Sequence, residues 1–166
     1  MFENICGAEG SGNFIAHAET KKFGEKFVTG PYGQVYKRID EHGNPLKKIL
    51  PFKEGERVDP VWAKMNAKQQ YTERAQEWLK RLAGKPGLTQ DRLDALVSTT
   101  QGTSKAKEAC YKYITEHWGD WDKIVEYIKT HAVTAAGNGK VMPGLKLRRL
   151  FEAAWFQGDK KPFKWY

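Results

Sequence analysis

The chain has 166 residues, of which 40% are apolar and 13% aromatic, and its formal net charge is +8. This length suits one compact domain with its own core, and the apolar content excludes an intrinsically disordered chain. The positive charge favours an acidic partner, such as nucleic acid, anionic lipid or a bacterial envelope polymer, and does not choose among them.

The sequence shows neither a membrane span nor a signal peptide, and its cysteines suit a reducing compartment. No apolar run approaches the roughly 18 residues that a membrane span requires. No basic segment followed by an apolar stretch opens the chain, so we expect no signal peptide and synthesis in the cytoplasm. The two cysteines, Cys6 and Cys110, fall on predicted apolar helix faces and lack the spacing of a metal site or redox pair. We expect both to be reduced core residues.

The first predicted element is a short helix that carries Phe2, Ile5 and Cys6 at positions i, i+3 and i+4. Glu9 follows at the end of the same apolar face, and Gly10 then breaks the helix. Apolar neighbours raise the pKa of a carboxyl, which is the property that a general acid needs near neutral pH. Spacing alone favours the simpler interpretation, an exposed carboxylate at a frayed helix end.

A small antiparallel sheet is predicted between about residues 14 and 55. Residues 26–29 and 34–37 have the composition of short strands, and the turn-forming residues 30–33 join them. A further strand is expected at 46–50. This region has too few apolar positions to be stable alone.

From Asp59 onward the sequence is predicted to be helical. The first of these helices begins at the cap Asp59 and at Pro60, and it continues to Gly84. Its expected inward residues form an imperfect apolar stripe: Trp62, Met65, Tyr71, Ala75, Trp78, Leu79 and Leu82.

Four more helices are predicted. They begin at Thr89, at about residue 106, after the cap Asp120 and at Pro143, and Gly158 is expected to stop the last one. The inward face expected for the last helix consists of Leu147, Leu150, Phe151, Ala154 and Trp155.

These elements predict an α+β fold in a single domain spanning residues 1–166. A short helix and a small sheet would form one lobe, about 1–58, and the helices would form a second lobe, about 59–158. We expect a cleft between the two lobes. A basic, aromatic tail, residues 159–166, follows.

Three segments resemble phage-type lysozymes. Ala8-Glu9-Gly10 and the hairpin 27–33 resemble that family's glutamate helix and its Thr-X-Gly-X-Gly strand. Residues 94–98, Asp-Ala-Leu-Val-Ser, are similar to the start of its internal helix. Residues 142–156 resemble its closing helix, with Gly-Leu, two arginines, a glutamate and an apolar pair. The matches occur in family order and span most of the chain.

The resemblance implies a lysozyme-like fold and a muramidase that hydrolyses the β-1,4 bond between N-acetylmuramic acid and N-acetylglucosamine. Glu9 would be the general acid, and Thr29 would help to hold the attacking water. A second carboxylate must activate that water or stabilise the developing cation, and inverting hydrolysis separates the two carboxyls by roughly 6.5–9.5 Å. The protein would be an endolysin or a virion-associated enzyme that acts on the periplasmic cell wall.

The second carboxylate is where the sequence departs from the family. The family aspartate, nine residues after the glutamate, is replaced by Ala18. Glu19, next to it, is our choice, Glu25 is the rival, and His17 is a third candidate. The alternative that this protein is a degenerate, inactive relative of the family therefore stays open.

Further substrate contacts are expected from Tyr32 and Tyr36, which could stack on sugar rings, and from Gln101, which stands where the family has a cleft-lining segment. Arg148 could bind a substrate carboxylate. Alternatively, one of Arg148 and Arg149 pairs with an acidic residue in the helix packing while the other is solvated.

No cofactor or metal is expected, since His17, His42, His117 and His131 lack metal-ligand spacing. His117 is expected to be a partly buried, hydrogen-bonded core histidine.

We expect peptidoglycan as partner and a monomeric protein without stable membrane insertion. Nucleic-acid binding is the weaker alternative, because the basic residues are spread along the chain without a recognised binding fold. The other alternative is a non-catalytic module that binds glycan or builds a virion. The sequence does not distinguish hydrolysis from lytic transglycosylation.

Overall fold

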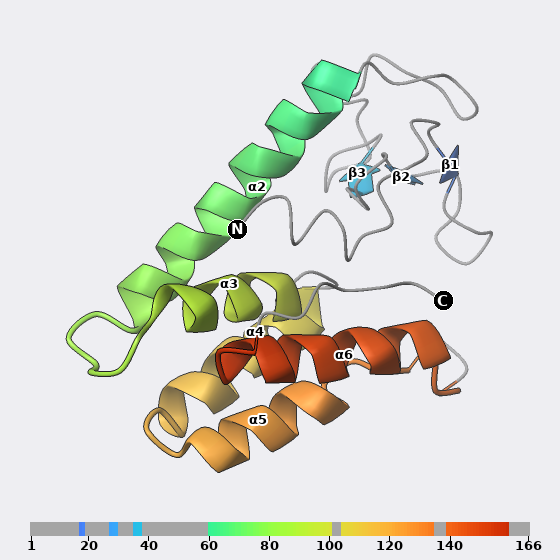
Figure 1. The fold of residues 1–166 in the computed structure, drawn as a ribbon. Coiled ribbons are helices and arrows are strands. Elements are labelled where there is room, and N and C mark those ends of the chain that lie inside the picture. Colours follow the sequence, from blue (N-terminus) through green and yellow to red (C-terminus); the bar gives the residue numbers. More distant parts are fainter. Residues whose placement is uncertain are drawn as a thin grey trace. The chain divides into compact units, whose positions relative to one another are not determined.

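The structure, a computed structural model, describes residues 17–18, 27–29, 35–37, 60–100, 104–134 and 139–159 (Figure 1). The chain divides into two compact units, and the larger one contains the described residues from Tyr71 onward. The described residues do not test three of the predictions: the lobe boundary near residue 58, the cleft between the lobes and the first helix.

Three short strands form an antiparallel sheet in the order β1-β2-β3. They are β1 (His17–Ala18), β2 (Phe27–Thr29) and β3 (Val35–Lys37). β2 and β3 fall within the predicted strand segments 26–29 and 34–37. That these strands belong to a separate lobe stays a prediction.

Helices account for most of the described residues from 60 onward. They are α2 (Pro60–Arg81), α3 (Gln90–Thr99), α4 (Ser104–Glu116), α5 (Trp121–Thr130) and α6 (Pro143–Phe156). α6 packs against both α3 and α5 (Figure 1).

The predicted helix ends at Thr89, Asp120 and Gly158 are confirmed. The side chain of Thr89 accepts a hydrogen bond from the backbone nitrogen of Arg92 at 3.2 Å, and Asp120 accepts one from Lys123 at 3.3 Å. These bonds satisfy amides that the first turn of a helix leaves without a partner. Gly158 follows α6 with a φ of 92°, a left-handed conformation that glycine adopts without strain. The predicted cap Asp59 lies outside the described residues.

The buried stripe of α2 is narrower than predicted. Tyr71, Ala75 and Trp78 are buried, as is Leu82, whereas Met65 and Leu79 are exposed. Residues 71, 75, 78 and 82 follow one another at helical spacing, and position 79 is about 100° around the helix from position 78. The inward placement of Met65 and Leu79 is therefore wrong. The side chain of Trp62 is not described.

The inward face predicted for α6 is wrong in a different way. Leu147 and Leu150 are exposed, and the buried positions are instead Arg148, Arg149, Glu152, Ala153, Trp155 and Phe156. Of the expected residues, Trp155 alone is buried, and Phe151 and Ala154 are partly buried. The helix is rotated because its charged residues find partners inside the protein.

The core around Trp78 and α4 confirms two predictions. Trp78 donates to the carbonyl oxygen of Leu96 at 3.1 Å and lies edge-on to Tyr111. Cys110 is fully buried as a free thiol, and burial raises its pKa well above the usual range. His117 is partly buried, and its Nδ1 lies 2.9 Å from the carbonyl oxygen of Tyr113. Cys6 lies outside the described residues.

Candidate functional site

The predicted site residues lie in several parts of the chain. Thr29 is the last residue of β2, Tyr36 is the middle residue of β3, and Arg148 is in α6. The remaining predicted residues lie outside the described part of the chain: Glu9, Glu19, Glu25, Tyr32 and Gln101.

The strand register shows which residues lie opposite Thr29, and so how Thr29 is placed relative to the candidates for the second catalytic group. Thr29 lies opposite His17 of β1 and Val35 of β3. Ala18, at the position where the resemblance would place an aspartate, lies opposite Val28, one step along the register. His17, and not Ala18, is therefore the residue directly opposite Thr29. Glu19, the preferred second carboxylate, is the next residue in the chain.

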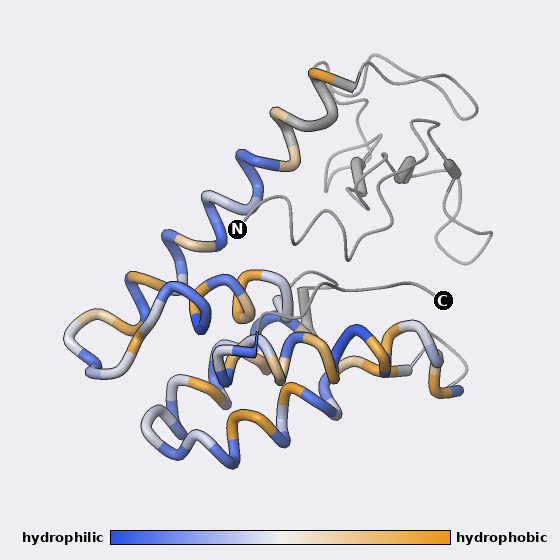
Figure 2. The backbone as a smooth tube through the Cα atoms, in the orientation of Figure 1, coloured by the Kyte–Doolittle hydropathy of each residue, from blue (hydrophilic) through white to orange (hydrophobic). Residues whose placement is uncertain are grey.

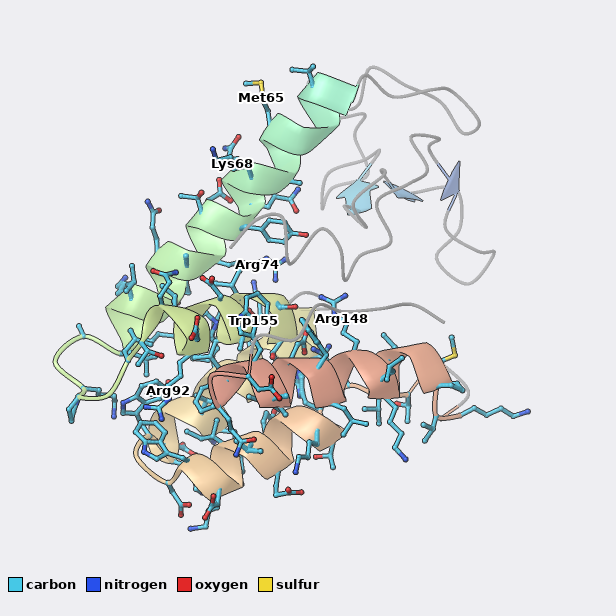
Figure 3. The ribbon with its side chains drawn as sticks, viewed as in Figure 1. Met65, Lys68, Arg74, Arg92, Arg148 and Trp155 are labelled. Carbon is cyan, nitrogen blue, oxygen red and sulfur yellow. The ribbon has the colours of Figure 1, made fainter. Side chains whose placement is uncertain are left out.

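A buried ion-pair network joins α6 to α3. Arg148, on α6, is labelled in Figure 3. Its Nε atom lies 2.9 Å from Oε1 of Glu152, and Arg149 donates to the other carboxylate oxygen. Ser98 and Thr99 of α3 also donate their hydroxyl protons to this carboxylate, Thr99 at 3.1 Å. Glu152 is thus held by four side chains.

Both arginines have further hydrogen-bond partners within the helical unit. Arg148 donates to the carbonyl oxygen of Ser98 at 3.1 Å, and Arg149 donates to that of His131 at 2.9 Å. Both side chains are buried, so the expectation that one of the two is solvated is wrong. The network ties α3, α6 and the residue that ends α5 together. The expectation that one of the two arginines pairs with an acidic residue in the helix packing is confirmed, and Glu152 is that residue for both. The contacts with Ser98, Thr99 and the carbonyl oxygen of His131 were not predicted.

Glu152 and Asp94 are the buried carboxyls among the described residues. Burial alone would raise the pKa of Glu152, but Arg149, Arg148 and Ser98 outweigh it, so the pKa lies below its usual value. Burial raises the pKa of Asp94, opposed in part by a hydrogen bond from Gln90 at 2.6 Å. Glu152 is therefore an ionised structural group and cannot serve as a general acid near neutral pH. Asp94, though protonated more readily, is buried inside α3.

His131 should make the stability of the protein depend on pH. Burial, assisted by the nearby Arg149, lowers its pKa from 6.5 to about 4. Between these two pKa values, His131 is therefore protonated in the unfolded chain and neutral in the folded protein. This contribution to stability is complete above about pH 6.5 and is lost as the pH falls toward 4.

We therefore expect the unfolding free energy to fall by about 1.2 kcal/mol between pH 6 and 5 on account of His131. Urea titrations of the wild type and of His131→Gln across this range measure the difference in slope. Parallel slopes for the two proteins would contradict the assignment of the depressed pKa to His131.

The described part of the chain was also searched for membrane-spanning helices and for groups of metal-binding side chains. None of its helices combines the length and apolar character needed to cross a membrane. Within the same residues, no group of three or more His, Cys, Asp or Glu side chains is placed to bind a metal ion.

No protein-family model and no curated protein matches the sequence. Among solved structures, the endolysin from Escherichia coli O157:H7 phage FAHEc1 aligns with a TM-score of 0.64. The alignment covers 98% of this chain and 93% of that chain, at 22% sequence identity. The chain has the fold of a phage endolysin. The predicted likeness is thereby confirmed at the level of the fold, and the roles of individual residues stay predictions.

Proposed function

We propose that this protein is a peptidoglycan hydrolase that cleaves the β-1,4 bond between N-acetylmuramic acid and N-acetylglucosamine. The observation that carries the proposal is the likeness to an endolysin, which extends over 98% of the chain. It is supported by Glu9 and Thr29, which stand at positions matching the catalytic segments of phage-type lysozymes. The protein would act on the wall after release from the cytoplasm, or as part of a virion.

The proposed chemistry uses a protonated Glu9 as the general acid for the leaving oxygen. A second carboxylate, Glu19 or its rival Glu25, deprotonates a water that Thr29 helps to position. In the β1-β2 register the residue paired with Thr29 is His17, the third candidate, and Ala18 is paired with Val28. With a carboxylate one residue beyond Ala18, the chain retains both acid and base.

The proposed substrate contacts are Tyr32 and Tyr36, which would stack on sugar rings, and Gln101. Arg148 fits this role poorly, because its guanidinium is buried and donates to Glu152 and Ser98. We assign Arg148 to the framework of the helical unit. No cofactor is needed for this chemistry.

The first test uses purified peptidoglycan sacculi and the wild-type protein. We expect release of soluble muropeptides whose mass carries one added water per bond cleaved. Products that end in an anhydro sugar would show a lytic transglycosylase instead, and an absence of any product would overturn the proposed activity.

A non-catalytic glycan-binding or virion structural protein of the same fold is the second candidate. The specific observation in its favour is Ala18, which removes the family carboxylate from its usual place. Such a protein would sediment with sacculi and leave them intact. Co-sedimentation measured in the same assay separates the two functions.

A further inference from the structure

The register of the small sheet divides its residues between two faces. β1 and β2 are antiparallel, with His17 opposite Thr29 and Ala18 opposite Val28. Successive residues of a strand belong to opposite faces of a sheet, whereas directly paired residues belong to the same face. His17 and Thr29 therefore share one face, and Ala18 and Val28 share the other. The position to which the resemblance assigns an aspartate is thus not on the face of Thr29.

The third strand adds three residues to the face of Thr29 without adding an acceptor. Thr29 also pairs with Val35 of β3, and Phe27, two residues before Thr29, pairs with Lys37. Valine and phenylalanine side chains have no hydrogen-bonding group, and a lysine ammonium has donor protons only. Among the described residues on this face, His17 is therefore the partner of Thr29 that can accept a hydrogen bond at neutral pH.

The attacking water of an inverting hydrolase has four hydrogen-bonding positions. One lone pair is directed to the anomeric carbon, and one O–H bond is directed to the catalytic base. The hydroxyl of Thr29 can donate to the second lone pair, which leaves the second O–H bond in need of an acceptor. A neutral imidazole is such an acceptor, and at position 17 it is paired with Thr29.

We infer that His17, together with Thr29, positions the attacking water. In its neutral form the imidazole accepts a hydrogen bond from the water, and the second carboxylate takes the proton that the water loses. The glycosidic C–O bond breaks as the new C–O bond forms, and Glu9 gives its proton to the leaving oxygen. This inference rests on the proposed function, because it adds a residue to the same site.

The inference makes the rate depend on the charge of one histidine. A protonated imidazole has no acceptor and would donate to the lone pair that must attack. An unperturbed histidine titrates near about pH 6.5. Lys37 is the charged residue that the described strands add to the same face, and a nearby cation favours the neutral imidazole. The rate should therefore fall as the pH drops through about 6, before a base carboxylate with a pKa of about 4 is protonated.

The test is the pH dependence of reducing-end release from purified sacculi by the wild type, His17→Ala and His17→Gln. We expect His17→Ala to lose at least about tenfold in rate at about pH 7.5, because the water is held less well. His17→Gln should retain more of the rate, since an amide oxygen also accepts a hydrogen bond. In both variants the acid limb of the pH profile should move from about pH 6 to about pH 4. A purely structural role of His17 would lower the rate at every pH and leave the acid limb in place.

The matched control is His117→Gln, the same substitution in the helical unit. α4 carries hydrophilic as well as hydrophobic residues (Figure 2), and His117 is only partly buried, so glutamine should be tolerated there. This variant should keep the rate and the acid limb of the wild type, and circular dichroism should show that all variants are folded.

Cleavage by the wild type with an acid limb that neither His17 variant moves would overturn the inference and leave the proposed function intact. A wild-type acid limb already at about pH 4 would do the same. Absence of any cleavage by the wild type would overturn the proposed function, and this inference with it.

Discussion

Replacing Glu9 by glutamine is expected to lower the rate of peptidoglycan cleavage by at least about two orders of magnitude. The amide keeps the size of the side chain but cannot donate a proton to the leaving glycosidic oxygen. Without that proton the departing sugar must leave as an alkoxide, which raises the barrier. The rate is measured as turbidity loss of outer-membrane-permeabilised Gram-negative cells and as reducing ends released from sacculi.

The matched control for this variant is Glu116→Gln, which neutralises an exposed carboxylate at the end of α4 and should leave the rate unchanged. Glu19→Gln and Glu25→Gln identify the second carboxylate, because only the variant that removes the base should lose activity to a similar degree. If Glu9→Gln clears cells as fast as the wild type, the general acid is another residue.

Replacing Glu152 by glutamine is expected to lower the unfolding free energy by about 3–5 kcal/mol. Glu152 is fully buried, and its carboxylate neutralises two arginines that are themselves buried. The substitution keeps the shape and some hydrogen bonds, but it leaves Arg148 and Arg149 without the carboxylate that the structure shows between them. Urea unfolding followed by circular dichroism measures the loss.

Glu126→Gln provides the comparison, since Glu126 also pairs with a cation, Lys129, but in an exposed i,i+3 pair. Its loss should cost under about 1 kcal/mol. Equal effects of the two substitutions would mean that the buried network contributes no more than a surface pair. The Glu152 variant should keep its activity per folded molecule at low temperature, because its role is structural.

Local spacing was sufficient to predict most of the helical part. The segments after Asp59 contain helices, and the caps at Thr89 and Asp120 lie at the expected residues. These features depend on side chains three or four positions apart, so the sequence contains the necessary information. The endolysin-like fold was likewise predicted from short motifs that keep their order along the chain.

The inward face of α6 could not be predicted in the same way. Helical periodicity assumes that charged residues face solvent, and in α6 they face the core. The hydroxyls of Ser98 and Thr99, which make this possible, are about fifty positions away in sequence. Nothing in the spacing of Arg148, Arg149 and Glu152 reveals those partners. Of the candidate catalytic residues, the structure describes the backbone of His17 and Thr29 alone, so the roles of all of them stay predictions.

Cys110 gives the helical unit an internal reporter of its own opening. The thiol is fully buried at the centre of α4, and its raised pKa keeps it protonated at neutral pH. A thiol-specific reagent can reach it only when the surrounding helices separate, because the thiolate is the reactive form and requires solvent. The rate of its modification would therefore follow how often this core opens, in a protein that carries no label.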